Sequence, residues 1–238
     1  MQSDSDRIPD LLVYGGTFDP PHLGHRHCME QAVKTFPRAD LLILPGYQSA
    51  GAGGLHKTTA TAFDHRLEMS RINFSGLNQG GQKLEVSELE KDLPSPNYSY
   101  RTMREVRLRY PQKLPLFVMG EDQWTVFDKW KNPERFLEES SVLVVLRSGQ
   151  MDKKALIRRS LDMLRRMGMN AELAKNACPI DLPGTGQKIW VSDAVPIQVS
   201  STKIRNHIEA TQERTLNSEF LHAGVLRYIE QHQLYRGE

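Results

Sequence analysis

The chain has 238 residues, enough for one domain with a sizeable core. Lysine and arginine number 31 and aspartate and glutamate number 29, so the formal net charge is +2. This near balance argues against a dedicated nucleic-acid binder and against a polybasic protein of the membrane surface. The longest apolar runs are far shorter than the roughly 20 residues that span a bilayer. We therefore expect neither nucleic acid nor a membrane as a partner.

The first ten residues and the two cysteines bear on the compartment. Residues 1–10 are polar and acid-rich, with no apolar signal segment, and we expect them to form a flexible terminus. Cys28 and Cys178 make no disulfide framework and have no metal-ligand spacing. We expect a cytoplasmic protein in which residues 11–238 form a single domain that includes C-terminal helices from about residue 200.

Short apolar runs alternate with helical patterns along the chain. Strands are predicted at 11–14, 41–44, 83–86, 116–119 and 141–146. Helices are predicted at 24–36, 63–72, 98–109 and 152–167, with helical sequence broken near Asn132 in between. The segment 176–186 is rich in proline and glycine and is predicted to be a loop. The alternation predicts an α/β fold, a doubly wound Rossmann-like parallel sheet with a small C-terminal helical part, which binds ligands beyond the carboxyl ends of its strands.

The first predicted strand is followed directly by the block Gly15-Gly16-Thr17-Phe18-Asp19-Pro20-Pro21-His22-Leu23-Gly24-His25. Paired glycines let the backbone approach a bound group, and the start of a helix at Gly24 carries positive partial charge. His22 and His25 are three residues apart, so both imidazoles can face one point, which suits a triphosphate. The plainer alternative is a tight strand-to-helix turn that Asp19 caps and the prolines stiffen.

This block resembles the T/H-x-G-H signature of the nucleotidyltransferase superfamily, whose members transfer nucleotidyl groups from ATP or CTP. The first residue of the signature separates branches of the superfamily. Pantetheine-phosphate adenylyltransferases typically have threonine there, and pyridine-nucleotide adenylyltransferases have histidine. Since this chain has His22, the resemblance favours the pyridine-nucleotide branch.

A second motif, Val199-Ser200-Ser201-Thr202-Lys203-Ile204-Arg205, precedes helical sequence near the C-terminus. Serine and threonine at a helix start are often only N-caps. Together with helix amides and an arginine one turn later they also form an anion site, because a guanidinium holds phosphate oxygens with two prongs. The run resembles the I-S-S-T-x-I-R motif of the same superfamily, with valine for the first isoleucine. The joint occurrence of the two motifs, in the family's order, is more specific than either motif alone.

A weaker match follows the second predicted strand. His56-Lys57 stands where bacterial nicotinate-nucleotide adenylyltransferases have His-Lys or His-Arg, so the resemblance assigns Lys57 to the phosphates. The preceding loop, residues 46–55, is longer and richer in glycine than in the family, which leaves its contacts open. The alternative for Lys57 is a solvated surface lysine. The same stretch nearly matches a P-loop, but His56 occupies the position that needs glycine, which disfavours a P-loop NTPase.

Three further matches concern the second substrate and the nucleotide. The run from Asn97 to Thr102 aligns with S-Y-T-x-D-T, so Ser99 stands where a threonine helps to hold the pyridine carboxylate or amide, while Arg101 departs from the usual aspartate. Gly120-Glu121-Asp122 resembles G-x-D, whose aspartate lies near the nucleotide ribose. Trp130 matches the tryptophan that stacks on the pyridine ring. The alternatives are plain helix starts for the first two matches and a core position for the tryptophan.

The resemblance extends from Val13 to Tyr235. It implies an enzyme of NAD biosynthesis that joins the 5′-phosphate of nicotinate mononucleotide to the α-phosphorus of ATP and releases pyrophosphate. It also implies direct in-line displacement with Mg²⁺ bound mainly through ATP phosphates, so we name no protein metal ligand. The last helix, with Leu234 and Tyr235 after it, is expected to serve packing.

The predicted roles fall into three groups. His22, His25 and Arg205 are expected to be catalytic, and Ser99 and Trp130 to bind the pyridine mononucleotide. ATP and its phosphates are assigned to Gly15, Gly16, Thr17, Phe18, Lys57, Gly120, Asp122, Ser201, Thr202 and Ile204. Two alternatives stay open: adenylyl transfer to nicotinamide mononucleotide or another phosphorylated small molecule, such as phosphopantetheine, and a nucleotide-binding module without catalysis. The choice between acid and amide, and the oligomeric state, a homo-oligomer included, also stay open.

Overall fold

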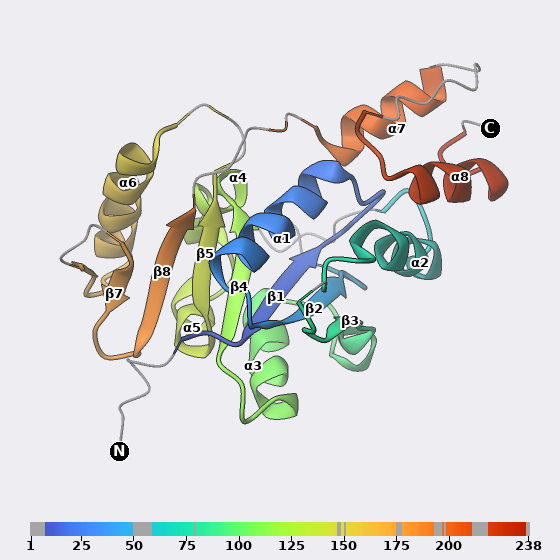
Figure 1. Cartoon of the computed structure of the whole chain (residues 1–238). Helices are drawn as coiled ribbons and strands as arrows, with labels where there is room; N and C mark the ends of the chain where they lie inside the picture. The colour runs from blue at the N-terminus through green and yellow to red at the C-terminus, as the bar shows by residue number, and fades with distance from the viewer. Residues whose placement is uncertain are drawn as a thin grey trace.

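A computed structural model, drawn in Figure 1, describes residues 8–49, 59–78, 80–146, 149, 151–174, 178–192, 197, 199–210 and 219–236. Within these ranges the strands form one eight-stranded sheet in the order β3-β2-β1-β4-β5-β8-β7-β6. All pairs from β3 to β8 are parallel, and the pairs β8–β7 and β7–β6 are antiparallel. The predicted doubly wound parallel sheet is confirmed, and it has an antiparallel edge in addition.

The predicted strands and helices are also confirmed, and no predicted boundary is wrong by more than two residues. The strands are β1 (Leu11–Gly16), β2 (Asp40–Pro45), β3 (Leu84–Val86), β4 (Pro115–Gly120), β5 (Ser141–Val145), β6 (Glu172–Leu173), β7 (Ile180–Leu182) and β8 (Gln187–Ser192). The helices are α1 (Leu23–Thr35), α2 (Phe63–Phe74), α3 (Ser99–Arg109), α4 (Glu121–Trp124), α5 (Pro133–Glu139), α6 (Lys153–Arg166), α7 (Ser201–Ala210) and α8 (Ala223–Gln231). The described residues also include two 3₁₀ turns, η2 (Leu89–Asp92) and η3 (Phe127–Lys129).

Helices cover both faces of the sheet, as Figure 1 shows. In β1, the side chains of Leu11 and Val13 pack in the cluster formed with α3, α5 and α6. Leu12 and Tyr14 point to the other face and pack with α1. Since a parallel strand between two helical layers is buried on both faces, its sequence is an unbroken apolar run, and this is why the central strands could be predicted.

The loop predicted over 176–186 is wrong in its second half. Residues Ile180–Leu182 form β7, which pairs with β8 through Ile180 and Ile189. Gly184 and Gly186 have φ of +95° and +72° in the turn that joins the two strands. Ile180 and Leu182 are buried, so the strand is held by the core. Three alternating residues between prolines and glycines are too few to predict a strand from periodicity.

The C-terminal helices α7 and α8 pack on α2, at the end of the sheet where α1 begins (Figure 1). The apolar residues that join the three helices are Met69, Ile204, Ile208, Leu221, Val225 and Ile229. The flexible terminus expected for residues 1–10 lies mostly outside the described residues. None of the helices in the described part of the chain is long and apolar enough to cross a membrane.

Candidate active site

A cavity of about 360 Å³ opens at the carboxyl ends of β1, β2 and β4. This is the edge at which open α/β sheets bind their ligands. The predicted site residues that line it are Gly15, Gly16, Thr17, His22, His25, Ser99, Gly120, Asp122, Trp130, Ser201, Thr202 and Arg205. The lining also includes polar residues that the sequence did not single out for the site, namely Asp19, Ser49, Glu90, Asn97, Thr102, Gln123 and Ser200. The N-terminal and C-terminal motifs therefore share one cavity.

His22 and His25 lie face to face at the beginning of α1. Their ring centroids are 3.6 Å apart and their planes differ by 21°. The His25 N–H donates to Nδ1 of His22 at 3.3 Å, and the His22 N–H donates to Nδ1 of His25 at 3.2 Å. The two rings thus form a reciprocal capping box in which imidazoles replace the usual hydroxyl and carboxylate. Because each Nδ1 accepts a backbone N–H, the proton of each neutral ring lies on Nε2, which is then the ring's donor.

Position 24, between the two histidines, requires glycine because there is no room for a side chain. A Cβ atom there would lie 2.9 Å from Cγ1 of Val199 and 3.1 Å from the ring of His22. Val199 belongs to the C-terminal motif, so the two motifs are in direct contact at this glycine. A side chain at position 24 would push apart the histidine pair and the segment that leads into α7.

Two predicted phosphate-binding residues have side chains in the core and not in the cavity lining. Phe18 is 1% exposed, has a φ of +52°, and meets the ring of His25 edge-on with centroids 5.1 Å apart. Ile204 is buried in the cluster that joins α7 to α2 and α8. Phe18 therefore supports the histidine from the side of the core, and Ile204 holds α7 in place. Lys57, a third predicted phosphate-binding residue, lies outside the described residues.

The C-terminal motif is held at the cavity by the carbonyl groups of the N-terminal motif. Ser201 Oγ donates to the carbonyl of Pro20 at 2.9 Å, and Nη1 of Arg205 donates to the carbonyl of Asp19 at 2.6 Å. Nη2 of Arg205 lies 3.4 Å from Oγ1 of Thr202, to which it donates. Oγ of Ser200 accepts the N–H of Lys203 at 3.3 Å. The N-cap of α7, which was the alternative role for this motif, is therefore Ser200. Ser201 and Thr202 both line the cavity.

The opposite wall is a network between the loop after β2 and the segment from η2 to α3. Oε2 of Glu90 accepts the N–H of Tyr47 at 3.0 Å, and Oε1 of Glu90 accepts the hydroxyl of Thr102 at 2.9 Å. Oδ1 of Asn97 accepts the N–H of Gln48 at 2.8 Å. These hydrogen bonds hold the loop after β2 against the segment that contains Ser99. Burial raises the pKa of Glu90 above its ordinary value, and the two hydrogen bonds to its carboxylate oppose this rise.

Arg66 ties together the loops that follow β1 and β2. It is 1% exposed on α2, and its Nη1 donates to the carbonyls of Thr17 at 2.7 Å and Gly46 at 2.6 Å. Its Nε lies 3.4 Å from the carbonyl of Thr61. Burial lowers the pKa of Arg66, and the negative charge of nearby Asp19 acts in the opposite sense. Both loops line the cavity, so Arg66 sets the spacing of its walls.

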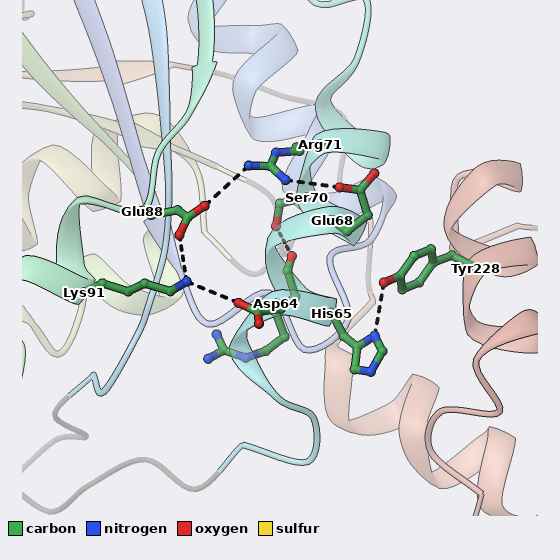
Figure 2. Close-up of polar contacts among 9 residues, drawn as sticks. Asp64, His65, Glu68, Ser70, Arg71, Glu88, Lys91 and Tyr228 are labelled. Carbon is green, nitrogen blue, oxygen red and sulfur yellow. Dashed lines mark hydrogen bonds and ion pairs between the residues drawn. The ribbon is translucent and has the colours of Figure 1, made fainter.

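Ion pairs on the surface of α2 hold the segment that carries Glu90 (Figure 2). Nζ of Lys91 lies 3.2 Å from Oδ1 of Asp64 and 2.7 Å from Oε2 of Glu88. Arg71 lies 3.2 Å from Glu68 and 3.6 Å from Glu88. Because exposed ion pairs of this kind are screened by solvent, they orient η2 more than they stabilise the fold.

Trp130 rests on the core and lines the cavity. Its ring centroid is 5.3 Å from that of Phe127 and 5.8 Å from that of Phe136, and the side chain is half-buried. Trp124 is the core tryptophan of this region, 1% exposed, and its Nε1 donates to Ser160 Oγ at 2.7 Å. Trp130 therefore packs against aromatic neighbours and also lines the cavity, and its stacking on a pyridine ring stays a prediction.

Acidic side chains are few at the cavity. Asp122, in the first turn of α4 directly after Gly120, is exposed. Asp19 and Glu90 are buried and already accept hydrogen bonds. In the described part of the chain, no group of three or more His, Cys, Asp or Glu side chains could hold a metal ion.

The chain is similar to known proteins along nearly its whole length. Residues 13–207 match the family described as cytidylyltransferase-like. A relative from Marinomonas sp. (strain MWYL1), named a probable nicotinate-nucleotide adenylyltransferase, is 27% identical over 233 residues, which cover 97% of this chain and 96% of that protein. A relative of the same name from Chlorobium luteolum is 31% identical over 140 residues, 59% of this chain and 70% of that protein.

A solved structure also resembles the chain. The nicotinic acid mononucleotide adenylyltransferase of Plasmodium falciparum, complexed with NaAD, has a TM-score of 0.67 to this chain at 16% identity. The match covers 96% of this chain and 98% of that one. At this identity the likeness shows the fold.

Proposed function

Because the chain belongs to the cytidylyltransferase-like family, we propose that it transfers the adenylyl group of ATP to nicotinate mononucleotide, a cytoplasmic step of NAD biosynthesis. The products are nicotinate adenine dinucleotide and pyrophosphate. The observation that carries the proposal is the meeting of the histidine motif and the serine-threonine-arginine motif at one end of a single cavity. The names of the relatives from Marinomonas and Chlorobium support the choice of substrate.

The reaction is a displacement at phosphorus. An oxygen of the mononucleotide phosphate forms a bond to the α-phosphorus of ATP, the bond from that phosphorus to the α–β bridging oxygen breaks, and pyrophosphate leaves with the electron pair. An ionised phosphate is already a nucleophile, so no proton has to be removed from it. The work left to the protein is to bring two anions together and to stabilise the charge that develops.

The N-termini of α1 and α7 and the side chains on them supply that stabilisation. We assign the Nε2–H groups of His22 and His25 to the triphosphate as neutral hydrogen-bond donors. Positive charge comes from the guanidinium of Arg205, with the hydroxyl of Thr202 and the backbone N–H groups at the start of α7 donating beside it, because the hydroxyl of Ser201 already donates to the carbonyl of Pro20. His22 is 2% exposed, and a donor in such a dry site acts more strongly than one in water.

ATP is expected to enter as its Mg²⁺ complex. The family resemblance implies that this ion is held mainly by the phosphate oxygens, which suit a hard cation. Such an ion would offset part of the negative charge on the triphosphate and on the pyrophosphate that leaves. Lys57, which the family resemblance places at the phosphates, and Asp122, which it places at the ribose, remain proposals of the same kind.

Arg205→Lys is expected to raise the KM for ATP or to lower kcat by about tenfold or more. An ammonium cannot reproduce the planar fork, and a charged hydrogen bond contributes roughly 1.5–3 kcal/mol. Steady-state kinetics with ATP varied, and the melting temperature measured in parallel, provide the test. If the kinetics are unchanged and the melting temperature is lower, Arg205 has only a structural role, in which it joins α7 to Asp19.

Trp130→Ala is expected to weaken mononucleotide binding by roughly 1–3 kcal/mol, by analogy with bases that stack on aromatic side chains. ATP binding should change little, and Trp130→Phe should recover part of the loss. Titration of tryptophan fluorescence with nicotinate mononucleotide measures the effect. A matched control is Trp124→Phe, which alters a buried indole in the same region. Equal weakening of ATP and mononucleotide by Trp130→Ala would assign the indole to packing alone.

Turnover assays decide the function itself. Wild-type protein with ATP and Mg²⁺ is given nicotinate mononucleotide, nicotinamide mononucleotide or phosphopantetheine in turn, and pyrophosphate release is measured. The expected result is turnover with nicotinate mononucleotide. Faster turnover with another acceptor would reassign the substrate, and ATP binding without turnover on any acceptor would make the protein a nucleotide-binding module.

A further inference from the structure

The chain turns back on itself after α8 and returns to the active-site side of the molecule. The Leu234 N–H donates to the carbonyl of Ile229 at 3.0 Å, and the Gln233 N–H donates to that of Glu230 at 3.3 Å. With Gln233 at a φ of +52°, this is a Schellman motif, and Leu234 packs in the same cluster as Ile229, as the motif requires. The turn delivers the next residue, Tyr235, to the loop after β1.

Tyr235 binds a buried carboxylate there. Its hydroxyl donates to Oδ1 of Asp19 at 2.8 Å. Asp19 is 3% exposed, and its carboxylate also accepts the hydroxyl of Thr61 at 2.7 Å and the N–H of Ala60 at 2.6 Å. A buried carboxylate needs such donors, because desolvation is costly without them. Burial, and then the negative charge of Asp19, raise the pKa of Tyr235, so its hydroxyl keeps its proton and remains a donor.

The peptide of Asp19 holds the phosphate-binding residues of α7. Its carbonyl accepts a hydrogen bond from Nη1 of Arg205, and the carbonyl of the following Pro20 accepts one from Ser201 Oγ. Asp19 also lies within the N-terminal motif that contains the two histidines. A single residue therefore connects the end of the chain to both motifs, and a small movement of its peptide would displace the guanidinium of Arg205.

We propose that Tyr235 is a positioning residue for the triphosphate site. Its hydroxyl fixes the side chain of Asp19, and the carbonyl of Asp19 in turn fixes Arg205 at the cavity. Tyr235 is not among the described residues that line the cavity, so it acts through Asp19 and not on the substrate. This proposal rests on the proposed function, because it needs a triphosphate at Arg205. It gives the closing segment a role beyond the packing that the sequence predicts.

The test compares Tyr235→Phe with Tyr228→Phe. Both substitutions remove one hydroxyl from the C-terminal segment, and the hydroxyl of Tyr228 shares its hydrogen bond, 3.1 Å long, with Nδ1 of His65 on α2 (Figure 2). Affinity for ATP is measured by calorimetry without the second substrate, together with kcat, both KM values and the melting temperature. Tyr235→Phe is expected to weaken ATP binding about tenfold, on the order of one hydrogen bond to a charged group. The KM for the mononucleotide should stay within about twofold, and Tyr228→Phe should leave both affinities within about twofold.

A second measurement tests the route through Arg205. In an Arg205→Ala background, Tyr235→Phe should cause no further loss of ATP affinity, because the group it positions has been removed. An equal loss in both backgrounds would overturn the proposal. So would equal effects of Tyr235→Phe and Tyr228→Phe on ATP affinity. Because ATP binding is measured without turnover, a wild-type protein that binds ATP but forms no dinucleotide would refute the proposed function and leave the role of Tyr235 to be judged separately.

Discussion

Replacing His25 with asparagine is expected to lower kcat by about 10²- to 10³-fold while the protein still folds. The ring of His25 has two separate tasks: Nδ1 accepts the N–H of His22, and Nε2 carries the donor that we assign to the triphosphate. Asparagine places an oxygen near the position of Nδ1, so it preserves the capping bond and removes the donor at Nε2. The loss of one preorganised donor to a developing charge typically costs about 3–4 kcal/mol.

The control for this variant is His25→Gln, which places an amide N–H near the position of Nε2 and gives up the acceptor near Nδ1. The glutamine variant should be more active than the asparagine variant, and its melting temperature should be lower. His25→Ala loses both groups and should combine the two defects. His22→Ala should have more effect on ATP binding, and also on stability, since His22 is buried and caps α1. Turnover close to that of the wild type in both histidine variants would contradict the assignment.

The features that can be predicted from the sequence are those that depend on residues close together along the chain. The first strand is an apolar run because both of its faces are covered, and the turn that follows it contains its own glycines and histidines. Position in a parallel sheet then places that turn at the carboxyl edge, with the loops after β2 and β4. This reasoning brings Gly16, His22 and Gly120 to one cavity without any knowledge of tertiary contacts.

What the sequence does not predict depends on partners far along the chain. Asp19 and Tyr235 are separated by 216 residues, and nothing near either of them signals the hydrogen bond they make. Glu90 lies in a charged stretch that resembles a solvated surface, yet the loop from β2 buries it. Phe18 shows the opposite case, since its place in the motif suggested contact with ATP and its side chain supports His25 from the core.

Arg66 is the clearest example of a residue whose role only the fold reveals. On α2 it shares a face with Ser70 and Asn73, both buried, so the buried side of the helix is not purely apolar. A charged residue at such a position would be expected at the surface. It is buried because the main-chain carbonyls of two cavity loops converge on its guanidinium.

Arg66→Met is therefore expected to lower the free energy of unfolding by roughly 3–5 kcal/mol, since the carbonyls of Thr17 and Gly46 would be left buried without their donor. For a chain of this size that corresponds to a fall in melting temperature of roughly 10 °C. Denaturant unfolding and thermal melts measure the effect. ATP affinity, measured well below the melting temperature, should fall as well, because the loops that Arg66 joins form two walls of the cavity.

The matched control is Arg71→Met on the same helix. Arg71 is exposed and pairs with Glu68 and Glu88 at the surface (Figure 2), so its loss should cost about 1 kcal/mol or less and leave ATP affinity unchanged. Arg66→Lys should fall between the two methionine variants, because it keeps a donor but not the length and planar shape of the guanidinium. If Arg66→Met and Arg71→Met melt at the same temperature, the buried guanidinium does not hold the two loops together. The spacing of the cavity walls must then come from the main-chain bond between Gly46 and Gly16, which measures 2.8 Å.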